Sequence, residues 1–258
     1  MTSAGSADPA APRLTLVVTT YREADVLEGS LPRIAAALRA LDGGAEVVFV
    51  DDGSGDGTVA AIERGLPHLA DLAPRLLVHE RNRGRGAALV TGFTAARGRN
   101  VGYLDLDLEV PETHVAACVE ALDAGADVAL ACRTYVRTRP GFDLRTFLSL
   151  GYRRLTRLVL RHPVKDTEAG YKFFRRESLS RLLPHVREGG WFFDTEIVML
   201  AWLARMRIAE IDVEFRRRSD KTSAVRVARD VRRYLAALGK FAARRGAVAR
   251  RLRTTAPA

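Results

Sequence analysis

The sequence predicts an α/β protein built as a single α/β/α sandwich with a mostly parallel central sheet. Three observations support this fold class. Apolar stretches alternate with helical patterns through the first half of the chain, which is typical of strand–helix–strand units. The apolar stretches have few polar interruptions, as expected for parallel strands covered by helices on both faces. Polar clusters follow them at their carboxyl ends, where open α/β sheets bind ligands.

The first units of this fold are expected between residues 14 and 74. The stretches "LTLVVTT" (14–20) and "AEVVFV" (45–50) are continuously apolar and therefore predict buried strands. A helix is expected between them at 24–41. A second helix is expected to begin near Thr58, directly after the glycine-rich segment "DDGSGDGT".

The alternation continues with a third strand, "RLLVHE" (75–80), and an alanine-rich helix at 85–97. The stretch "NVGYLDLD" (100–107) predicts a fourth strand, followed by a helix from about Pro111 to Asp123. "ADVALAC" (126–132) predicts a fifth strand.

The second half is less regular. Residues 144–162 are expected to form a helix with Leu, Phe and Tyr on one side and Arg on the other. "IAEIDVEFRRR" predicts a strand that leaves the core, and a basic amphipathic helix is expected to close the chain. We therefore expect a disordered tail at 1–13, one domain at 14–224 and a basic extension at 225–258.

Composition excludes several classes of protein. The 258 residues are 47% hydrophobic, which is enough for a real core. Cys118 and Cys132, the two cysteines, give neither a disulfide framework nor a zinc site. The chain has no apolar run of about 18 residues, the length of a membrane-spanning helix, and its start lacks the pattern of a signal peptide. A cytoplasmic location is therefore expected.

Positive charge is concentrated near the carboxyl end of the chain. From Val225 onward there are ten basic residues and one acidic residue, Asp230, so this segment carries +9 of the net charge of +10. Val227, Val231, Leu235, Leu238 and Phe241 recur among the arginines at helical spacing. Such a helix can lie on an anionic membrane surface, bind nucleic acid, or pack on its own domain. Nucleic acid is disfavoured, because it would leave the acidic residues described below without a role.

Three carboxylates end the predicted fourth strand. Asp105, Asp107 and Glu109 alternate with Leu, so in a strand they would point to one side. A hard divalent cation such as Mg²⁺ or Mn²⁺ would relieve their repulsion and carry a nucleoside diphosphate. The alternative is a strand end that enters a solvated loop, where acids are common.

Two further segments suit a nucleotide. In "VVFVDDGSGDGT", Asp51 and Asp52 end a strand before a glycine turn, and a carboxylate there can accept from a base or a ribose. The alternative is an ordinary turn with Asp as a helix cap. In "NRGRGAAL", two Gly and two Arg at a helix start suit a phosphate, although such loops are often only solvated.

These segments resemble a known family. "VVTTYREADVL", "VVFVDDGSGDGT", "NRGRGAALVTG", "YLDLDLEVP", "DTEAGYKFFRRE" and "GGWFFDTEIVMLA" occur in the order seen in family-2 inverting glycosyltransferases. The chain is most similar to the branch of dolichyl-phosphate and polyprenyl-phosphate mannose or glucose synthases, over roughly Leu14 to Val227. The resemblance implies a GT-A fold and transfer of a sugar from GDP-mannose or UDP-glucose to a polyprenyl phosphate.

The resemblance also assigns roles by position. It implies that Asp105 and Asp107 form the metal-binding Asp-x-Asp motif, with Glu109 as a further ligand. Asp194 and Glu196 match a pair of acidic residues on the acceptor side, so we count them with Asp107 as candidate catalytic residues. The residues that it implies for the nucleotide sugar are Thr20, Tyr21, Glu23, Asp51, Asp52, Arg85 and Lys221. At Lys221 the order "RRRSDKTS" departs from the family pattern, and Arg85 stands where Lys is common.

The acceptor decides the chemistry. A hydroxyl acceptor needs a general base, which Asp194 or Glu196 would supply. A lipid phosphate is already ionised and needs only cations that bring two anionic groups together. The segments "RTYVRTRPGFDLR" (133–145) and "YRRLTR" carry arginines that could do this, or that simply face water. A polyprenyl-phosphate acceptor and peripheral contact with the inner face of a membrane are expected; the alternative is a soluble hydroxyl acceptor.

Overall fold

The computed structural model describes residues 11–135, 144–215 and 227–254. They form one seven-stranded sheet in the order β3-β2-β1-β4-β6-β5-β7. The strands are β1 Leu14–Thr20, β2 Ala45–Asp51, β3 Arg75–Val78, β4 Asn100–Leu104, β5 Val128–Tyr135, β6 Tyr171–Arg175 and β7 Ile208–Phe215. Strands β3, β2, β1 and β4 are parallel, β6 is antiparallel to both of its neighbours, and β5 pairs in parallel with β7. The mostly parallel sheet predicted from the sequence is confirmed.

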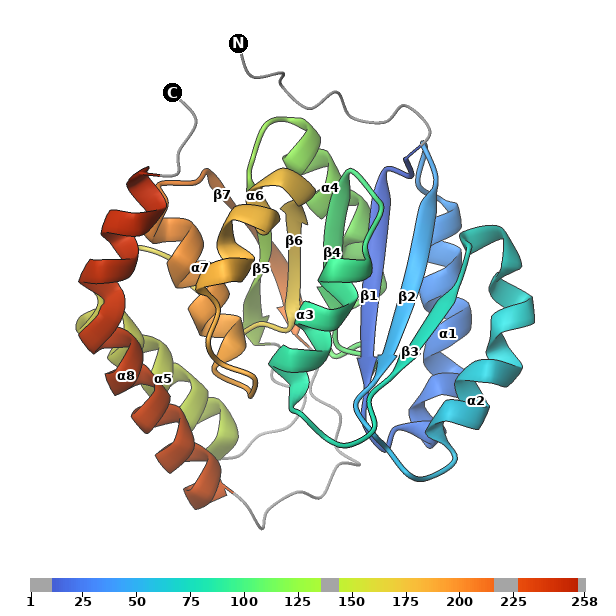
Figure 1. Ribbon diagram of the computed structural model, residues 1–258, viewed down its shortest axis with the longest axis horizontal. Helices are drawn as coiled ribbons and strands as arrows, with labels where there is room; N and C mark the ends of the chain where they lie inside the picture. The colour runs from blue at the N-terminus through green and yellow to red at the C-terminus, as the bar shows by residue number, and fades with distance from the viewer. Residues whose placement is uncertain (1–10, 136–143, 216–226, 255–258) are drawn as a thin grey trace.

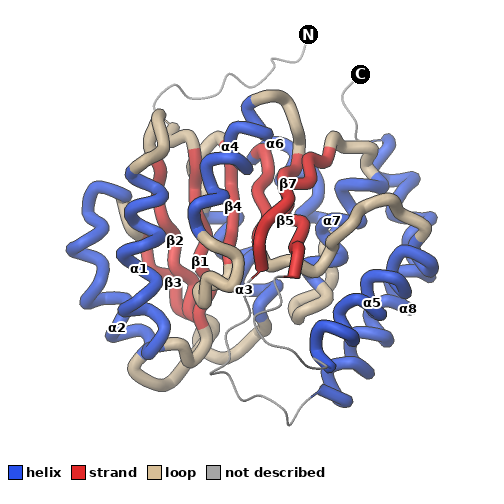
Figure 2. The backbone as a smooth tube through the Cα atoms, turned by 180° about the vertical axis from the view of Figure 1, so that it is seen from behind, coloured by secondary structure: helices blue, strands red, loops and turns tan. Residues whose placement is uncertain are grey.

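Helices cover both faces of the sheet and make a three-layer sandwich. The helices are α1 Ala24–Arg39, α2 Thr58–Gly65, α3 Arg85–Ala95, α4 Val115–Asp123, α5 Leu144–Leu160, α6 Arg176–Leu182, α7 Phe193–Leu203 and α8 Val227–Thr254. Short 3₁₀ turns lie at Leu66–Leu72, Glu112–His114 and Leu183–His185. Helices α3, α6 and α7 lie on one face (Figure 1), and α1, α2 and α4 lie on the other (Figure 2). Each face has its own cluster of buried apolar side chains.

The sequence prediction misses β6. Its residues lie within "DTEAGYKFFRRE", but a run of five residues with Lys in the second position gives no clear strand period. In the structure β6 lies between β4 and β5 and pairs Gly102 with Phe173. A Cβ atom at position 102 would overlap the Phe173 ring, so the close approach of the two strands there requires glycine.

Strand β4 ends earlier than predicted, and this changes the geometry of the acidic residues. It ends at Leu104 instead of residue 107. After it, the Asp105 amide donates to the Gly170 carbonyl, and the Leu108 amide donates back to the Asp105 carbonyl. Leu108 has a φ of 52°, a left-handed value. Asp105, Asp107 and Glu109 therefore lie in a turn, and the expectation that strand alternation points all three to one side is wrong.

Helices α5 and α8 lie side by side at one edge of the molecule (Figure 1). The rings of Tyr152 and Tyr234 meet at 4.2 Å, and Arg245 donates to the Val159 carbonyl, so the two helices run in the same direction. Their amino-terminal ends project beside the carboxyl ends of the strands. Both helices therefore begin next to the edge of the sheet that carries the polar loops.

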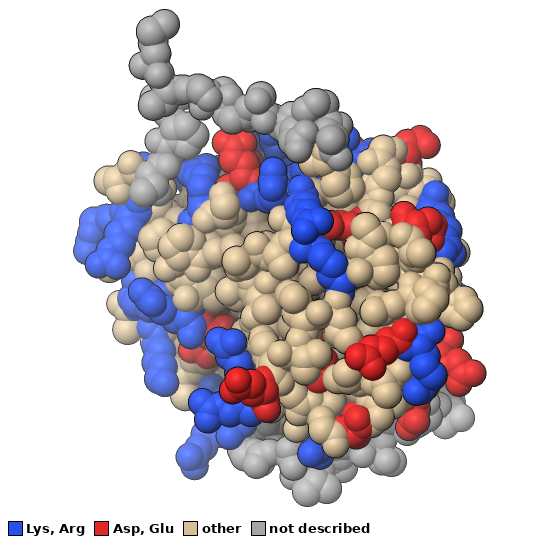
Figure 3. Space-filling model, turned by 45° about the vertical axis from the view of Figure 1, so that its right-hand side comes forward, with Lys and Arg blue, Asp and Glu red and all other residues tan. Residues whose placement is uncertain are grey.

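The basic helix at the carboxyl end packs on its own domain over much of its length. Leu238, Phe241, Val248 and Leu252 are buried, whereas Val231 and Leu235 keep 38% and 45% of their surface exposed. The alternative of packing on the domain therefore applies to the second half of α8. On the face in Figure 3, basic side chains gather along the left edge and both signs alternate toward the right. Among the described residues, no helix is long and apolar enough to cross a membrane.

Candidate active site

The candidate site lies at the carboxyl ends of the parallel strands, where the loops after β1, β2, β3 and β4 meet. Of the residues assigned from the sequence, all but Lys221 are placed; Lys221 and residues 136–143 of the arginine-rich segment lie outside the described residues. The placed residues divide into a group that shapes the loops and a group around Arg85.

Asp51 holds the end of β2 to the end of β1. It is fully buried, and its carboxylate accepts from the Ser54 amide at 2.8 Å, the Thr20 hydroxyl at 3.2 Å and the Ser54 hydroxyl. Thr20 is itself 2% exposed. These two residues therefore fix the turn that begins the glycine segment, and their side chains do not face a ligand space in this structure.

Asp52 holds the "NRGRG" loop. Its carboxylate accepts from the Arg83 amide at 2.9 Å and the Gly84 amide at 2.8 Å, and it lies 2.7 Å from Nδ1 of His79. His79, which the sequence argument did not single out, also lies 2.9 Å from the Thr91 hydroxyl. The side chain of Asp52 is buried, so its contacts here are structural.

The loop after β1 brings two more predicted residues to the same edge. Tyr21 is 40% exposed, and the Arg22 guanidinium lies 5.3 Å from its ring centroid. The Glu23 amide donates to the Thr58 hydroxyl at the start of α2. Tyr21 thus presents an aromatic face at the edge where a nucleotide base is expected.

Arg85, the first residue of α3, joins two of the predicted acids. Its guanidinium donates to Asp194 at 2.5 Å and to Asp105. The Tyr103 and Trp191 ring centroids lie 5.3 Å and 5.6 Å from it. Only 11% of the Arg85 side chain is exposed, although Trp191 is 64% exposed. Desolvation opposes the charge of Arg85, but the carboxylates of Asp105 and Asp194 outweigh it and raise the pKa of the guanidinium.

Asp194, in the first turn of α7, is buried and accepts hydrogen bonds from three side chains. Besides Arg85, it accepts from the Tyr103 hydroxyl at 2.6 Å and from Lys172 at 3.0 Å. Lys172 comes from β6, is fully buried, and also donates to the Ala169 carbonyl. Burial lowers the pKa of Lys172 and raises that of Tyr103, while Asp194 favours the charged lysine. Lys172 was not predicted as a site residue, because a lysine in an apolar run gives no sign of its partner 22 residues away.

Asp105 is held close to the strand edge but remains accessible. A Cβ at position 170 would overlap its carboxylate, so the close approach requires Gly170. Its side chain is 45% exposed. Desolvation first, and then the carboxylates of Asp194 and Asp107, raise the pKa of Asp105, while Arg85 acts in the opposite direction.

The acidic turn offers a partial set of metal ligands. Among the described residues, no group of three or more His, Cys, Asp or Glu side chains is gathered closely enough to hold a metal ion, so the triad with Glu109 is not formed. Asp105 and Asp107 remain as partly exposed, mutually repelling oxygen donors. This donor set fits a hard divalent cation that takes its other ligands from substrate phosphates and water.

Glu196 lies in the first turn of α7 and contacts the loop that precedes this helix. It is fully buried and accepts from the Arg187 amide at 3.0 Å, the Glu188 amide at 2.9 Å and the Arg244 guanidinium of α8. In the same loop, the Gly189 carbonyl accepts from the Gly86 and Ala87 amides in the first turn of α3. Glu196 therefore connects α8 to the start of α3.

A second cluster of charge lies at the end of β5. Asp166 is fully buried, and its carboxylate accepts from Arg133 at 2.7 Å and from Arg153 of α5. Glu168 accepts from the Ser149 hydroxyl at 2.7 Å. Two arginines expected to assist an acceptor phosphate are thus held in place by a buried acid.

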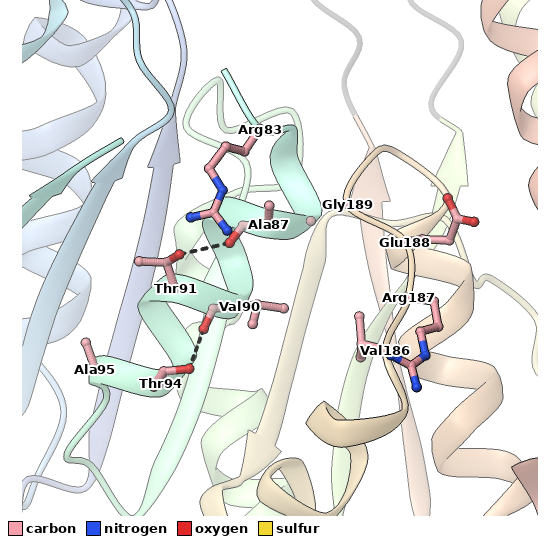
Figure 4. Close-up of a pocket in the computed structure, with 11 residues that line it drawn as sticks. Arg83, Ala87, Val90, Thr91, Thr94, Ala95, Val186, Arg187, Glu188 and Gly189 are labelled. Atoms are coloured by element: carbon pink, nitrogen blue, oxygen red, sulfur yellow. Dashed lines mark hydrogen bonds between the residues drawn. The ribbon is translucent and has the colours of Figure 1, made fainter. Parts of the chain in front are cut away.

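A groove of about 500 Å³ runs along α3 on the side away from the acidic turn. Figure 4 shows Thr91, Val90 and Thr94 of α3 on one wall, and Val186 to Gly189 on the other. Neither Asp105 nor Asp194 lines it. The groove is therefore separate from the cluster around Arg85.

Comparison with known proteins agrees with the motif order. The family model described as glycosyl transferase family 2 matches residues 15–183. The chain is 33% identical to the glycosyltransferase AglD of Haloferax volcanii, over 88% of this chain and 36% of AglD. It is 31% identical to the dolichyl-phosphate beta-glucosyltransferase of Drosophila melanogaster, over 78% of this chain and 66% of that protein. The chain thus spans about a third to two thirds of these relatives.

Solved structures support the fold. Glucosyl-3-phosphoglycerate synthase of Mycobacterium tuberculosis, in complex with Mn²⁺, UDP-glucose and phosphoglyceric acid, has a TM-score of 0.69 at 20% identity, over 91% of this chain and 81% of that chain. A mannosyltransferase of Pyrobaculum calidifontis, in complex with GDP-mannose and Mn²⁺, has a TM-score of 0.59 at 22% identity, over 96% and 76%. At these identities the likeness is one of fold.

Proposed function

The chain belongs to glycosyl transferase family 2, and from that premise we propose that it transfers a hexose from a nucleotide sugar to a dolichyl-type polyprenyl phosphate. Relatives named as dolichyl-phosphate beta-glucosyltransferases support this acceptor at 28% to 31% identity. The donor is of the UDP-glucose or GDP-mannose type. The reaction inverts the configuration at the transferred carbon and uses Mg²⁺ or Mn²⁺.

One observation carries the choice of a phosphate acceptor. The two carboxylates that a hydroxyl acceptor would require as a base, Asp194 and Glu196, are 3% and 0% exposed and accept hydrogen bonds from cationic side chains. A general base must come within hydrogen-bond reach of the acceptor and be free to take its proton. A phosphate needs no such base, so the observed geometry suits it better. In this proposal Asp194 and Glu196 position other groups.

The donor would lie across the carboxyl edge of the sheet. The base stacks near Tyr21, in the space bounded by the turns that Asp51 and Asp52 fix. Asp105 and Asp107 would hold the divalent cation, which supplies neutralisation of the diphosphate as it leaves. Arg85 lies beside Asp105 and can donate two parallel hydrogen bonds to a phosphate. Asp194 keeps Arg85 at this edge, and Lys172 and Tyr103 keep Asp194 in place.

The acceptor phosphate would approach from the side of α5 and α8. Arg133 and Arg153 lie there at the end of β5, and the two helices present their amino-terminal ends to the same edge. Val231 and Leu235 are exposed on α8, with exposed arginines at 232 and 233 between them. We propose that this end of α8 makes peripheral contact with an anionic membrane in which the lipid acceptor is dissolved.

The test is consumption of donor. The protein is incubated with Mn²⁺ or Mg²⁺ and a panel of UDP- and GDP-sugars, together with a polyprenyl phosphate or with the matched polyprenol that lacks the phosphate. We expect one donor to be consumed only with the lipid phosphate, and the product to be a glycosylated lipid phosphate of inverted configuration. Transfer to the polyprenol, or only to a soluble hydroxyl compound, would instead support the hydroxyl-acceptor alternative.

A further inference from the structure

Arg85 forms an ion pair with Asp105, the carboxylate that the metal ion is expected to use. Its guanidinium bonds to Oδ1 of Asp105 with one nitrogen and to Oδ2 of Asp194, at 2.5 Å, with another. Within residues 11–135, 144–215 and 227–254, it is the one cationic side chain that forms an ion pair with Asp105. A cation from solution that binds Asp105 must therefore replace this contact or share the carboxylate with it.

The two ends of this bridge differ in how much they depend on Arg85. Asp194 also accepts from Lys172 at 3.0 Å and from the Tyr103 hydroxyl at 2.6 Å, so it remains satisfied if the guanidinium moves. Asp105 is 45% exposed and can accept a new partner from solution. The bridge can therefore open at Asp105 while the buried half of the network stays intact.

The guanidinium also contacts two aromatic rings. The Tyr103 and Trp191 ring centroids lie 5.3 Å and 5.6 Å from it, and Trp191 is 64% exposed. Aromatic faces attract a guanidinium at these distances. A guanidinium released from Asp105 can therefore keep an aromatic partner that is open to solvent.

We propose that Arg85 is a built-in competitor of the metal ion, and that it makes metal binding depend on the diphosphate of the donor. This inference rests on the proposed function. A metal ion alone must break the Arg85–Asp105 pair and then lie beside a guanidinium of like charge. When a nucleoside diphosphate is present, its phosphates accept the displaced guanidinium, so the same contact no longer opposes the metal.

The consequence is a thermodynamic coupling between two ligands. If the pair is closed in most molecules, the apparent affinity for the metal alone is reduced by the fraction that is open. The diphosphate removes this reduction, and by reciprocity the metal strengthens binding of the diphosphate by the same factor. Arg85 is a positioning residue in this scheme, and its removal should change metal binding in the absence of any reaction.

The experiment measures Mn²⁺ binding directly, from the electron paramagnetic resonance signal of free Mn²⁺, with no sugar donor or acceptor present. Wild type, Arg85→Gln and Arg64→Gln are compared, each alone and with UDP or GDP. Arg64→Gln is the matched control, because it removes the same charge from an exposed side chain in the last turn of α2, outside the loops at the sheet edge. Circular dichroism and a thermal melt check that each variant is folded.

The expected result is that the effect of Arg85→Gln on Mn²⁺ binding depends on whether UDP or GDP is present. Alone, Arg85→Gln should bind Mn²⁺ about tenfold more tightly than wild type, and Arg64→Gln should stay within about twofold. UDP or GDP should strengthen Mn²⁺ binding at least about tenfold in wild type and in Arg64→Gln, but much less in Arg85→Gln. Arg85→Lys, which keeps the charge but cannot bridge two carboxylates in the same way, should lie between.

Three outcomes would overturn the inference. Weaker Mn²⁺ binding by Arg85→Gln would mean that Arg85 holds the carboxylates ready for the metal. Equal binding by wild type and Arg85→Gln would mean that the pair does not oppose the metal. Absence of Mn²⁺ binding in every protein, even with UDP and GDP, would remove the metal site and the inference together, whereas the consumption of donor tests the transfer reaction separately.

Discussion

Five acidic residues were expected to act in catalysis or metal binding, and four of them form two pairs with opposite surroundings in the structure. Asp105 and Asp107 lie in a turn at the sheet edge, and Asp105 is 45% exposed. Asp194 and Glu196 lie in the first turn of α7, 3% and 0% exposed, and each accepts at least three hydrogen bonds. The sequence shows both pairs as an acid, a spacer and an acid.

The comparison of the two pairs shows how the surroundings of a carboxylate limit its chemistry. A buried carboxylate that is paired with Lys or Arg is held ionised and oriented, and breaking the pair costs several kcal/mol. A carboxylate that keeps an accessible oxygen can bind a ligand without that cost. We therefore expect substitutions in the α7 pair to act on folding and positioning, and substitutions in the turn to act on transfer. The following changes test this contrast, from the largest effect to the smallest.

Asp194→Leu should cause the largest loss, and the loss should be in stability. The substitution leaves Lys172 fully buried without its carboxylate and the Tyr103 hydroxyl without an acceptor, and it leaves Arg85 paired with Asp105 alone. Removing one partner of a buried ion pair destabilises by about 3–5 kcal/mol. Urea denaturation followed by circular dichroism measures the effect. The double variant Asp194→Leu with Lys172→Met should recover part of the lost stability. A loss below about 1 kcal/mol in Asp194→Leu alone would contradict the role of Asp194 as the buried partner of Lys172, Tyr103 and Arg85.

Asp107→Asn should have the opposite profile. It removes a charge from a partly exposed turn, so the free energy of unfolding should stay within about 0.5 kcal/mol of wild type. Loss of electrostatic stabilisation of the leaving group should lower kcat on the order of 10²–10³-fold. The assay uses the donor and lipid phosphate identified in the donor panel, and a chelator should reproduce the effect in wild type. Full activity of Asp107→Asn would show that the acidic turn is not the metal site.

The sequence was sufficient for the layers of the fold and for the edge where the site lies. Buried parallel strands have continuous apolar runs, and β1, β2 and β4 were therefore located to within a few residues. The loops that follow them were expected at one edge because parallel strands end together. β6 was missed because a five-residue strand inserted antiparallel between distant elements leaves no periodic signal.

The partners of the charged residues could not be read from the sequence. Arg85 and Asp194 are 109 positions apart, and Glu196 and Arg244 are 48 apart. Such pairs depend on how the strands and helices are ordered in space, which includes the unpredicted β6. The expected direction of Asp105, Asp107 and Glu109 also failed for a local reason, because the chain leaves β4 at Leu104 and turns.

His162 tests whether a buried titratable group away from the sheet edge acts on stability alone. It is 5% exposed at the end of α5, and burial, followed by the charge of Arg157, lowers its pKa to about 4. The unfolded chain takes up this proton below about pH 6.5. The stability that the neutral imidazole provides is therefore present above pH 6.5 and is lost as the pH falls toward 4.

The matching variant is His162→Leu. Between pH 7.5 and pH 5, the wild-type free energy of unfolding should fall by on the order of 2 kcal/mol more than that of the variant. Urea denaturation at the two pH values gives both numbers. At pH 7.5 the kcat of His162→Leu should equal that of wild type, because His162 follows the carboxyl end of α5 and is not one of the candidate site residues. An identical pH dependence in the two proteins would remove His162 as the cause.

The smallest expected effect concerns α8, whose two halves repeat the contrast between buried and accessible groups. Leu238, Phe241, Val248 and Leu252 pack into the core, so a truncation after Phe241 would disturb folding and say little about membranes. Val231 and Leu235 are exposed at the end of the helix beside the sheet edge, so they can be changed with little loss of packing.

The double substitution Val231→Ser with Leu235→Ser should weaken binding to anionic liposomes several-fold to about tenfold, because two apolar side chains no longer enter the interface. The fold should keep its stability to within about 0.5 kcal/mol. The matched control is Leu158→Ser, since Leu158 is 75% exposed at the opposite end of α5. Sedimentation with vesicles at low and high salt separates the apolar contribution from that of the arginines, which salt screens. An equal loss in both variants would mean that the liposomes detect general surface hydrophobicity, and no loss in either would place the membrane contact elsewhere on the chain.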